Sequence, residues 1–148
     1  MTAVLPNVSS GTWVVTRLFG RAFVADEDVI VFADGIPGFP DAQRFTLFQA
    51  NVPALAWLQS LDDLALTFLM VQRATLPEPP HAGTAESWAI VTLPHGTGPA
   101  TANLQAPVLI DMVLNLGRQV VQTDSPYGTA VPFDLERLLA PPRPTLHP

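Results

Sequence analysis

The chain has 148 residues, 48% hydrophobic and only 14% charged, so it is long enough for one ordinary domain with a sizeable core. Seven arginines, no lysine and thirteen acidic residues give a formal net charge of −6, which argues against direct binding to a nucleic-acid backbone. The absence of cysteine excludes disulfides and thiol chemistry, and no apolar run reaches the roughly 18 residues of a membrane span, so we expect a cytoplasmic protein with no membrane segment.

Strands are predicted along most of the chain. Runs of β-branched and aromatic residues recur between clusters of Gly, Pro, Asn and Asp, a pattern typical of all-β domains. The predicted strands are residues 12–18, 21–25, 29–32, 44–49, 54–60, 65–72, 87–93, 107–115 and 118–123. Their short connections favour antiparallel pairing.

Two of these strands carry apolar side chains on both faces. In RFTLFQ, Phe45 and Leu47 face one way and Phe48 the other, and SWAIVTL at 87–93 alternates in the same manner. Two-sided strands are expected where a sheet closes on itself or where a second layer covers it. We therefore predict an all-β fold, a small antiparallel barrel-like domain.

One short helix is predicted at 134–140, where Asp134 can cap the first turn. Its apolar stripe consists of Leu135, Leu138 and Leu139. A helix this short is not stable alone, so it either docks on its own domain or presents its leucines to a partner. We expect a single domain, with a core at about 17–133 and the helix and a Pro-rich tail over 134–148.

The first candidate binding element is the GIPGF turn (35–39). Its two glycines can adopt positive φ, while Pro37 fixes its own φ and favours an extended conformation at Ile36. A rigid connection between two strands explains all five residues. The alternative is that the same rigidity presents Ile36, Pro37 and Phe39 at the edge of a binding surface.

The second candidate element is the NLQAP segment (103–107), inside TANLQAPVLID. The amides of Asn103 and Gln105 flank Leu104, and Pro107 removes a backbone donor at the start of a strand. The segment is either an internal turn in which Asn103 caps its own backbone, or an edge against which a partner segment lies.

The third candidate element is the Tyr127 turn (124–127), at the end of GRQVVQTDSPY. Asp124, Ser125 and Pro126 are typical turn residues. Tyr127 is a large amphipathic side chain, which either packs in the core or contributes interface energy when half-buried.

Nothing in the sequence indicates catalysis, a metal site or a cofactor. The histidines never occur at the paired spacing of metal ligands; they are His81, His95 and His147. Ser125 and Asp124 are adjacent on one turn, so together with His95 they do not form a catalytic triad. The acidic clusters at 26–28 and 62–63 look like solvated strand connections. We expect a protein that is not an enzyme.

The order and spacing of these three segments, with VIVFADGIPGFPDAQRFTLF (29–48) and WLQSLDDLALTFLMV (57–71), resemble the flagellar assembly factor FliW family over roughly residues 17–132. The resemblance implies an antiparallel barrel-like fold and a non-catalytic adaptor. Members of the family bind flagellin and the translational repressor CsrA, which they antagonise allosterically, so that flagellin export frees the adaptor to restrain CsrA. The 72–86 connection is shorter here than is usual in the family.

The alternative is a β-barrel module that binds a small apolar ligand. The hydrophobic composition and the three tryptophans, Trp13, Trp57 and Trp88, motivate this interpretation, because tryptophans can line a cavity. A filled core explains the same residues. The oligomeric state is not predicted by the sequence.

Overall fold

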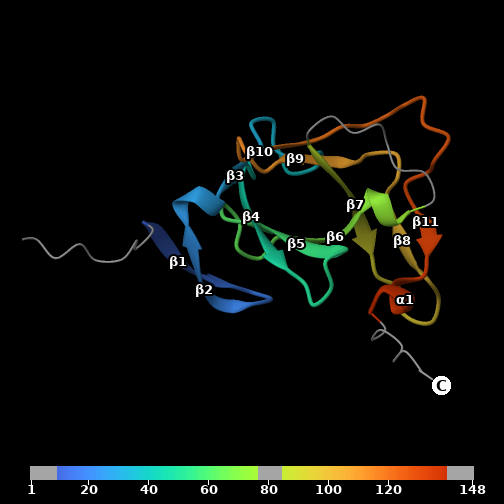
Figure 1. The fold of residues 1–148 in the computed structure, drawn as a ribbon, viewed down its shortest axis with the longest axis horizontal. Coiled ribbons are helices and arrows are strands. Elements are labelled where there is room, and N and C mark those ends of the chain that lie inside the picture. The colour runs from blue at the N-terminus through green and yellow to red at the C-terminus, as the bar shows by residue number, and fades with distance from the viewer. Residues whose placement is uncertain (1–9, 77–84, 140–148) are drawn as a thin grey trace, which may run out of the picture.

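The computed structural model describes residues 10–76 and 85–139, in which strands make up nearly all of the regular structure (Figure 1). The strands are β1 (Gly11–Thr16), β2 (Gly20–Ala25), β3 (Ile30–Val31), β4 (Arg44–Gln49), β5 (Leu55–Ser60), β6 (Thr67–Gln72), β7 (Glu86–Thr92), β8 (Ala100–Ala102), β9 (Val108–Asp111), β10 (Leu116–Gln119) and β11 (Val131–Phe133). The helical elements are two 3₁₀ turns, η1 (Asp26–Asp28) and η2 (Arg73–Thr75), and the helix α1 (Leu135–Leu139). Within the described ranges, no helix has the length and apolar character needed to cross a membrane.

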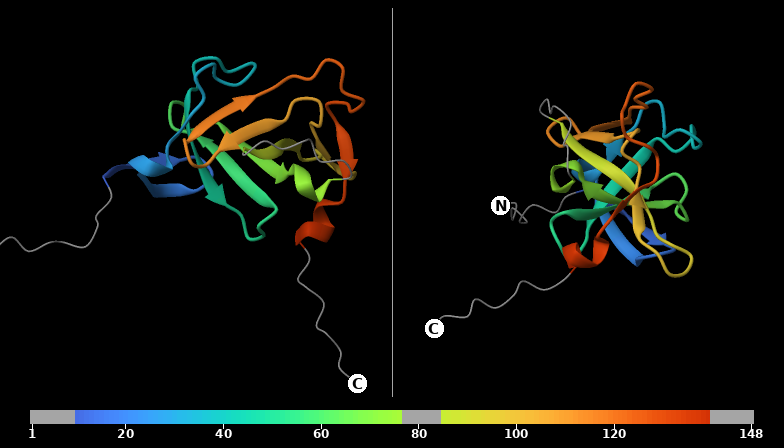
Figure 2. Two further views of the ribbon diagram at one scale, coloured as in Figure 1. Left: turned by 45° about the horizontal axis from the view of Figure 1, so that its top comes forward. Right: turned by 90° about the vertical axis from the view of Figure 1, so that its right-hand side faces the viewer.

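Seven strands close into a barrel. The hydrogen-bonded order β7-β6-β5-β4-β3-β10-β9 returns to β7, because β9 pairs with the first half of that strand (Figure 2). Every pairing in the barrel is antiparallel except the one between β3 and β10, where Leu116 lies opposite Val31 in parallel register. The predicted all-β barrel-like fold with one short C-terminal helix is confirmed.

Strand β7 divides one of its edges between two partners. Its first half pairs with β9, with Trp88 opposite Val108, and its second half pairs with β8, with Val91 opposite Ala102. β8 in turn pairs with β11. The strands β8 and β11 therefore leave the barrel and lie outside it, at the same end of the molecule as α1 (Figure 1, right).

The barrel interior is filled by side chains from alternate positions of its strands, which we call the inner core. Phe32 and Phe45 meet edge to face with ring centres 4.9 Å apart, and both are fully buried. The other large members are Ile30, Ile36, Leu58, Met70, Trp88, Val108 and Ile110. Burial of this many aliphatic and aromatic groups is the dominant favourable contribution to folding.

The opposite faces of β5, β6 and β7 form a second, outer core. Its buried side chains include Leu55, Leu69, Val71, Leu76, Ala89, Val91 and Leu104, with Ala100 and Ala102 of β8. The half-buried side chains of Val131, Phe133, Leu135 and Leu138 cover this core from β11 and α1. The apolar residues on both faces of 87–93 are thus explained by a closed barrel on one side and a second layer on the other.

The hairpin β1–β2 forms a separate two-stranded sheet beside the barrel (Figure 1). Its inner face buries Val24 and Thr16, and Phe19 in the connecting turn packs against Phe48 at 4.7 Å and Trp57 at 5.8 Å between ring centres. This contact accounts for the apolar outer side of β4, where Phe48 lies.

The predicted strand at 107–115 is wrong at its C-terminal end. The Asp111 side chain accepts hydrogen bonds from the backbone N–H groups of Val113 and Leu114, at 2.9 and 3.0 Å, and Asn115 has a φ of 53°. These features turn the chain, so β9 ends at Asp111 and a separate strand, β10, starts at Leu116. The short strands β8 and β11 were not predicted.

The predicted helix is present as α1, and the described part of it docks on its own domain. The backbone N–H of Arg137 donates to the Asp134 carboxylate at 3.0 Å, which is the expected cap. Leu135 and Leu138 pack on the outer core, whereas Leu139 is 50% exposed. The predicted Pro-rich tail lies outside the described residues.

We expect Gly117→Ala to lower the free energy of unfolding by about 1–3 kcal/mol, because an added methyl group overpacks the inner core. A Cβ at this position would lie 2.3 Å from the buried ring of Phe32. The matched control is Gly96→Ala, where a Cβ meets nothing within 4 Å. Chemical denaturation of both variants measures the difference, and equal stabilities would contradict the packing argument.

Candidate functional site

The GIPGF turn has the backbone conformation that the sequence predicts. The backbone N–H of Phe39 donates to the carbonyl of Ile36 at 2.6 Å, and Gly35 and Gly38 have φ of 67° and 91°. Pro37 followed by a glycine at positive φ is the signature of a type II turn. Ile36 is buried in the inner core, whereas Pro37 is exposed and Phe39 is 41% exposed, with its ring 5.7 Å from that of Phe68.

Asp62 fixes the chain where it leaves this turn. Its Oδ2 accepts hydrogen bonds from the backbone N–H groups of Gln43 and Arg44, both at 2.8 Å, and its Oδ1 pairs with the Arg44 guanidinium at 2.9 Å. Partial burial acts to raise the pKa of Asp62, but the backbone and guanidinium donors outweigh it and hold the pKa below its ordinary value. Asp62 thus lies in an exposed strand connection, as the sequence indicates, and in addition holds the backbone of Gln43 and Arg44.

The NLQAP segment is an internal turn with its polar groups satisfied, the first of the two alternatives. Asn103 Oδ1 accepts hydrogen bonds from the backbone N–H groups of Gln105 and Ala106, at 3.2 and 3.1 Å. Leu104 is buried in the outer core and Pro107 is buried as well. The side chains of Asn103 and Gln105 are only half-buried, so they are the part of this segment that a partner can reach.

Residues 119–128, which we call the strap, run from the end of β10 past the Tyr127 turn and are hydrogen-bonded to the NLQAP segment. The N–H groups of Val120 and Gln122 donate to the carbonyls of Pro107 and Gln105, at 3.0 and 2.8 Å. At the other end of the strap, the carbonyl of Gly128 accepts from the N–H of Leu104 at 3.2 Å. The NLQAP segment and the Tyr127 turn are therefore neighbours in space.

Tyr127 is half-buried and packs against the outer core. Its backbone N–H donates to Ser125 Oγ at 3.1 Å, and Asp124 before it is exposed. The guanidinium carbon of Arg73 lies 5.4 Å from the centre of the tyrosine ring, within the range of a cation–π interaction. Arg73 is only 4% exposed, so the outer core contains a buried cation that the sequence analysis did not identify.

Two grooves flank the strap. The turn groove, of about 520 Å³, lies between residues 34–38 and Pro40 on one side and residues 117–121 on the other. The tyrosine groove, of about 610 Å³, is lined mainly by Leu76, Leu104, Tyr127, Val131, Phe133 and Leu138. The GIPGF turn thus faces the start of the strap across the turn groove, and the strap is hydrogen-bonded to the NLQAP segment. The side chains of Ile36 and Leu104 are buried beneath these elements.

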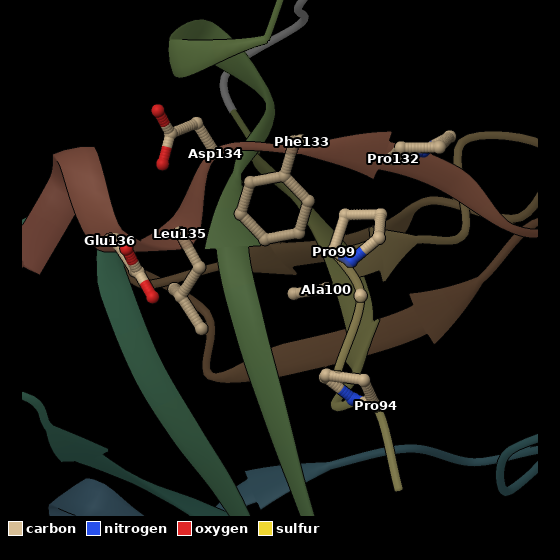
Figure 3. Close-up of a pocket in the computed structure, with 9 residues that line it drawn as sticks. Pro94, Pro99, Ala100, Pro132, Phe133, Asp134, Leu135 and Glu136 are labelled. Atoms are coloured by element: carbon tan, nitrogen blue, oxygen red, sulfur yellow. The ribbon is translucent and has the colours of Figure 1, made fainter. Parts of the chain in front are cut away.

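A third hollow, the helix groove, has a volume of about 520 Å³ and contains none of the predicted partner-binding residues. Figure 3 shows Phe133 and Leu135 lining it from β11 and α1, with Pro94 and Pro99 on the facing loop. The sequence analysis missed this hollow because it depends on β8 and β11, which were not predicted.

The side chains that the sequence analysis considered for metal binding or catalysis are not gathered at one place. The part of the chain that the structure describes contains no group of three or more His, Cys, Asp or Glu side chains that could hold a metal ion. His95 lies in the exposed loop after β7, and His81 and His147 lie outside the described residues.

The three tryptophans do not line a common cavity. Trp88 is 3% exposed and belongs to the inner core, whereas Trp57 packs against the outer core. Trp13 is 58% exposed on the hairpin, where the guanidinium of Arg21 lies 4.4 Å from its ring centre. Trp57 and Trp88 are therefore explained by packing within the fold, whereas Trp13 is largely exposed on the hairpin.

We expect Asn103→Ala to lower the free energy of unfolding by about 1 kcal/mol, because the N–H groups of Gln105 and Ala106 lose their acceptor. Asn103→Asp keeps an acceptor at the same place and serves as the control. Thermal unfolding compares the two variants, and the prediction fails if they are equally stable.

The low pKa of Asp62 predicts a pH-dependent contribution to stability. Because the pKa is lower in the folded than in the unfolded chain, this contribution is present above about pH 4 and is lost as the pH falls through the folded-state pKa. We expect Asp62→Asn to cost about 1 kcal/mol at neutral pH and little in strong acid, since the site is partly exposed. Denaturation across this pH range compares Asp62→Asn with Asp41→Asn, which removes an exposed carboxylate as the control. The same pH dependence in both variants would contradict the role assigned to Asp62.

Comparison with known proteins identifies a family that this chain matches. A family model described as FliW protein matches residues 13–78 and 80–133, which include the GIPGF turn, the NLQAP segment and the strap. The matched residues also contain every strand of the barrel, and all of the β1–β2 hairpin except the first two residues of β1. The match ends at Phe133, so α1 lies beyond it.

Individual relatives agree with the family model. The flagellar assembly factor FliW of Heliobacterium modesticaldum is 35% identical over 130 residues, which cover 77% of this chain and 85% of that protein. That of Treponema denticola is 29% identical over 129 residues, covering 77% and 88%. A crystal structure of the flagellar assembly factor FliW superposes with a TM-score of 0.72 and 26% identity, covering 82% of this chain and 96% of that one. The family model, the relatives and the solved structure agree, and the chain belongs to the FliW family.

Proposed function

We propose that this chain is a cytoplasmic flagellar assembly factor that binds flagellin and, in competition with it, the translational repressor CsrA. The observation that carries the proposal is the match to the FliW family over residues 13–78 and 80–133, which spans all three candidate binding elements. The relatives from Heliobacterium and Treponema carry the name flagellar assembly factor, which supports the same role here.

The proposed mechanism is a mass-action switch without a catalytic step. While unexported flagellin is abundant, it occupies the adaptor and CsrA is free to repress flagellin synthesis. When flagellin is exported, the adaptor is released and binds CsrA. Each partner lowers the free concentration of adaptor available to the other, so the ratio of concentration to Kd for each partner sets the state of the system. Antagonism of CsrA is proposed to be allosteric, because a net charge of −6 is modest for an RNA mimic.

The partner surface is proposed to comprise the exposed parts of the three elements. Phe39 and Tyr127 are its aromatic groups, and aromatic side chains in partly formed pockets often dominate interface energies. The amides of Asn103 and Gln105 and the carboxylate of Asp124 supply polar groups around them. A partner chain lying along the strap reaches both the turn groove and the tyrosine groove.

The first test is calorimetric titration of the purified protein with monomeric flagellin and with CsrA from the same organism, at two salt concentrations. Binding to both, with each displacing the other, supports the switch. Binding to flagellin alone would leave a chaperone-like role and remove the translational arm. Binding to neither would overturn the proposed function.

We expect Phe39→Ala to weaken binding to at least one of the two partners by about tenfold or more, because its exposed ring lines a hollow of about 250 Å³ together with Ala42 and Leu66. Leu93→Ala is the matched control, since Leu93 is 48% exposed and follows β7 at the end that pairs with β8. The same titrations measure both variants. Unchanged affinity for both partners would show that the GIPGF turn serves the fold alone.

A further inference from the structure

The turn between β9 and β10 exposes an unusual number of apolar side chains. Met112 is 49% exposed, Val113 91% and Leu114 65%. Val31 and Leu116 beside them are 40% and 50% exposed. They lie directly opposite each other in the parallel pair of β3 and β10, so their side chains share one face. We call these five residues the β9–β10 tip.

Hydrogen bonds hold the tip in one conformation. Asp111 Oδ1 accepts from the N–H groups of Val113 and Leu114, at 2.9 and 3.0 Å. Asn115, with its φ of 53°, donates through Nδ2 to the carbonyl of Glu27, and its own carbonyl accepts from the N–H of Val31 at 2.9 Å. A preorganised apolar surface loses little conformational entropy when a partner covers it.

The tip is bordered by carboxylates. The turn η1 places Asp26, Glu27 and Asp28 in solvent next to Asn115, and Asp111 begins the tip itself. Two basic residues are near in register. Arg44, opposite Val31, is paired with Asp62 at 2.9 Å, whereas Arg118, two residues after Leu116, is exposed. With Asp26, Glu27, Asp28 and Asp111 around it, the tip has mainly acidic surroundings.

We propose that the β9–β10 tip is a docking surface for a protein segment that presents apolar side chains beside Lys or Arg. The apolar part of such a segment would cover Met112, Val113 and Leu114, and its cations would face the carboxylates of η1 and Asp111. The charge complementarity distinguishes this occupant from an anionic membrane, which the same carboxylates repel. The inference goes beyond the proposed function, because none of the residues assigned above to flagellin or CsrA binding belongs to the tip.

The test uses a short amphipathic helical peptide of leucine and lysine, and a peptide of the same pattern with glutamate in place of lysine. Fluorescence anisotropy is expected to show that the protein binds the lysine peptide at least about tenfold more tightly than the glutamate peptide. The double variant Val113→Ser, Leu114→Ser removes apolar contact without changing the charge and is expected to weaken binding of the lysine peptide by about tenfold, whereas Leu93→Ser is expected to leave it within about twofold.

The electrostatic contribution to peptide binding is tested by a second comparison, between two double variants that each remove two carboxylates. Asp26→Asn with Asp28→Asn is expected to weaken binding of the lysine peptide and reduce its salt dependence, whereas Asp63→Asn with Glu136→Gln removes the same charge elsewhere and is expected to do neither. If the double serine variant does not fold, the single variant Val113→Ser, at the most exposed position of the tip, replaces it.

Three outcomes would overturn the proposal: equal affinity for the two peptides, equal effects of the tip and control variants, or binding to phosphatidylglycerol vesicles that the tip variants abolish. The last outcome would assign the tip to a lipid surface. The proposed function is tested separately, by titration with flagellin and CsrA. A negative result there does not change how the peptide results are interpreted.

Discussion

The pairing of Trp88 in β7 with Val108 in β9 is the contact on which the rest of the molecule depends. It closes the barrel around the inner core, and the same strand continues past it to pair with β8, so β7 also carries the wall of the outer core. One strand therefore contributes to both hydrophobic cores, Trp88 to the inner one and Ala89 to the outer one. The two cores share a single scaffold and constrain each other's geometry.

The candidate binding surface is built on this scaffold mainly by backbone hydrogen bonds. The strap is attached to the NLQAP segment at Gln105, Pro107 and Leu104, and these residues are placed by the outer core beneath them. The candidate contact groups thus lie on loops whose backbone is hydrogen-bonded, with Phe39 exposed and Tyr127 half-buried. This arrangement explains how a domain with few charged residues can present a specific surface without long flexible side chains.

Sequence patterns predicted the barrel and the geometry of the GIPGF turn, because alternation and the Pro-Gly pair act locally. They failed for β8 and β11, whose three residues each are too few to show a period. They also missed the end of β9, because apolar residues continue past Asp111. The turn is made by the Asp111 carboxylate, which accepts hydrogen bonds from the backbone N–H groups of Val113 and Leu114. The burial of Arg73 and the approach of Leu104 to Gly128 depend on contacts between distant segments, which no local pattern reports.

The one parallel pair of the barrel, β3 with β10, has a consequence for the order in which the protein can form during synthesis. The meander from β4 to β7 uses neighbouring strands and can assemble early, whereas β3 and β7 keep unpaired edges until the hairpin of β9 and β10 inserts between them. Closure must await the emergence of Gln119 from the ribosome. Until then the nascent chain presents two strand edges and an open inner core, the state in which it is most prone to aggregate.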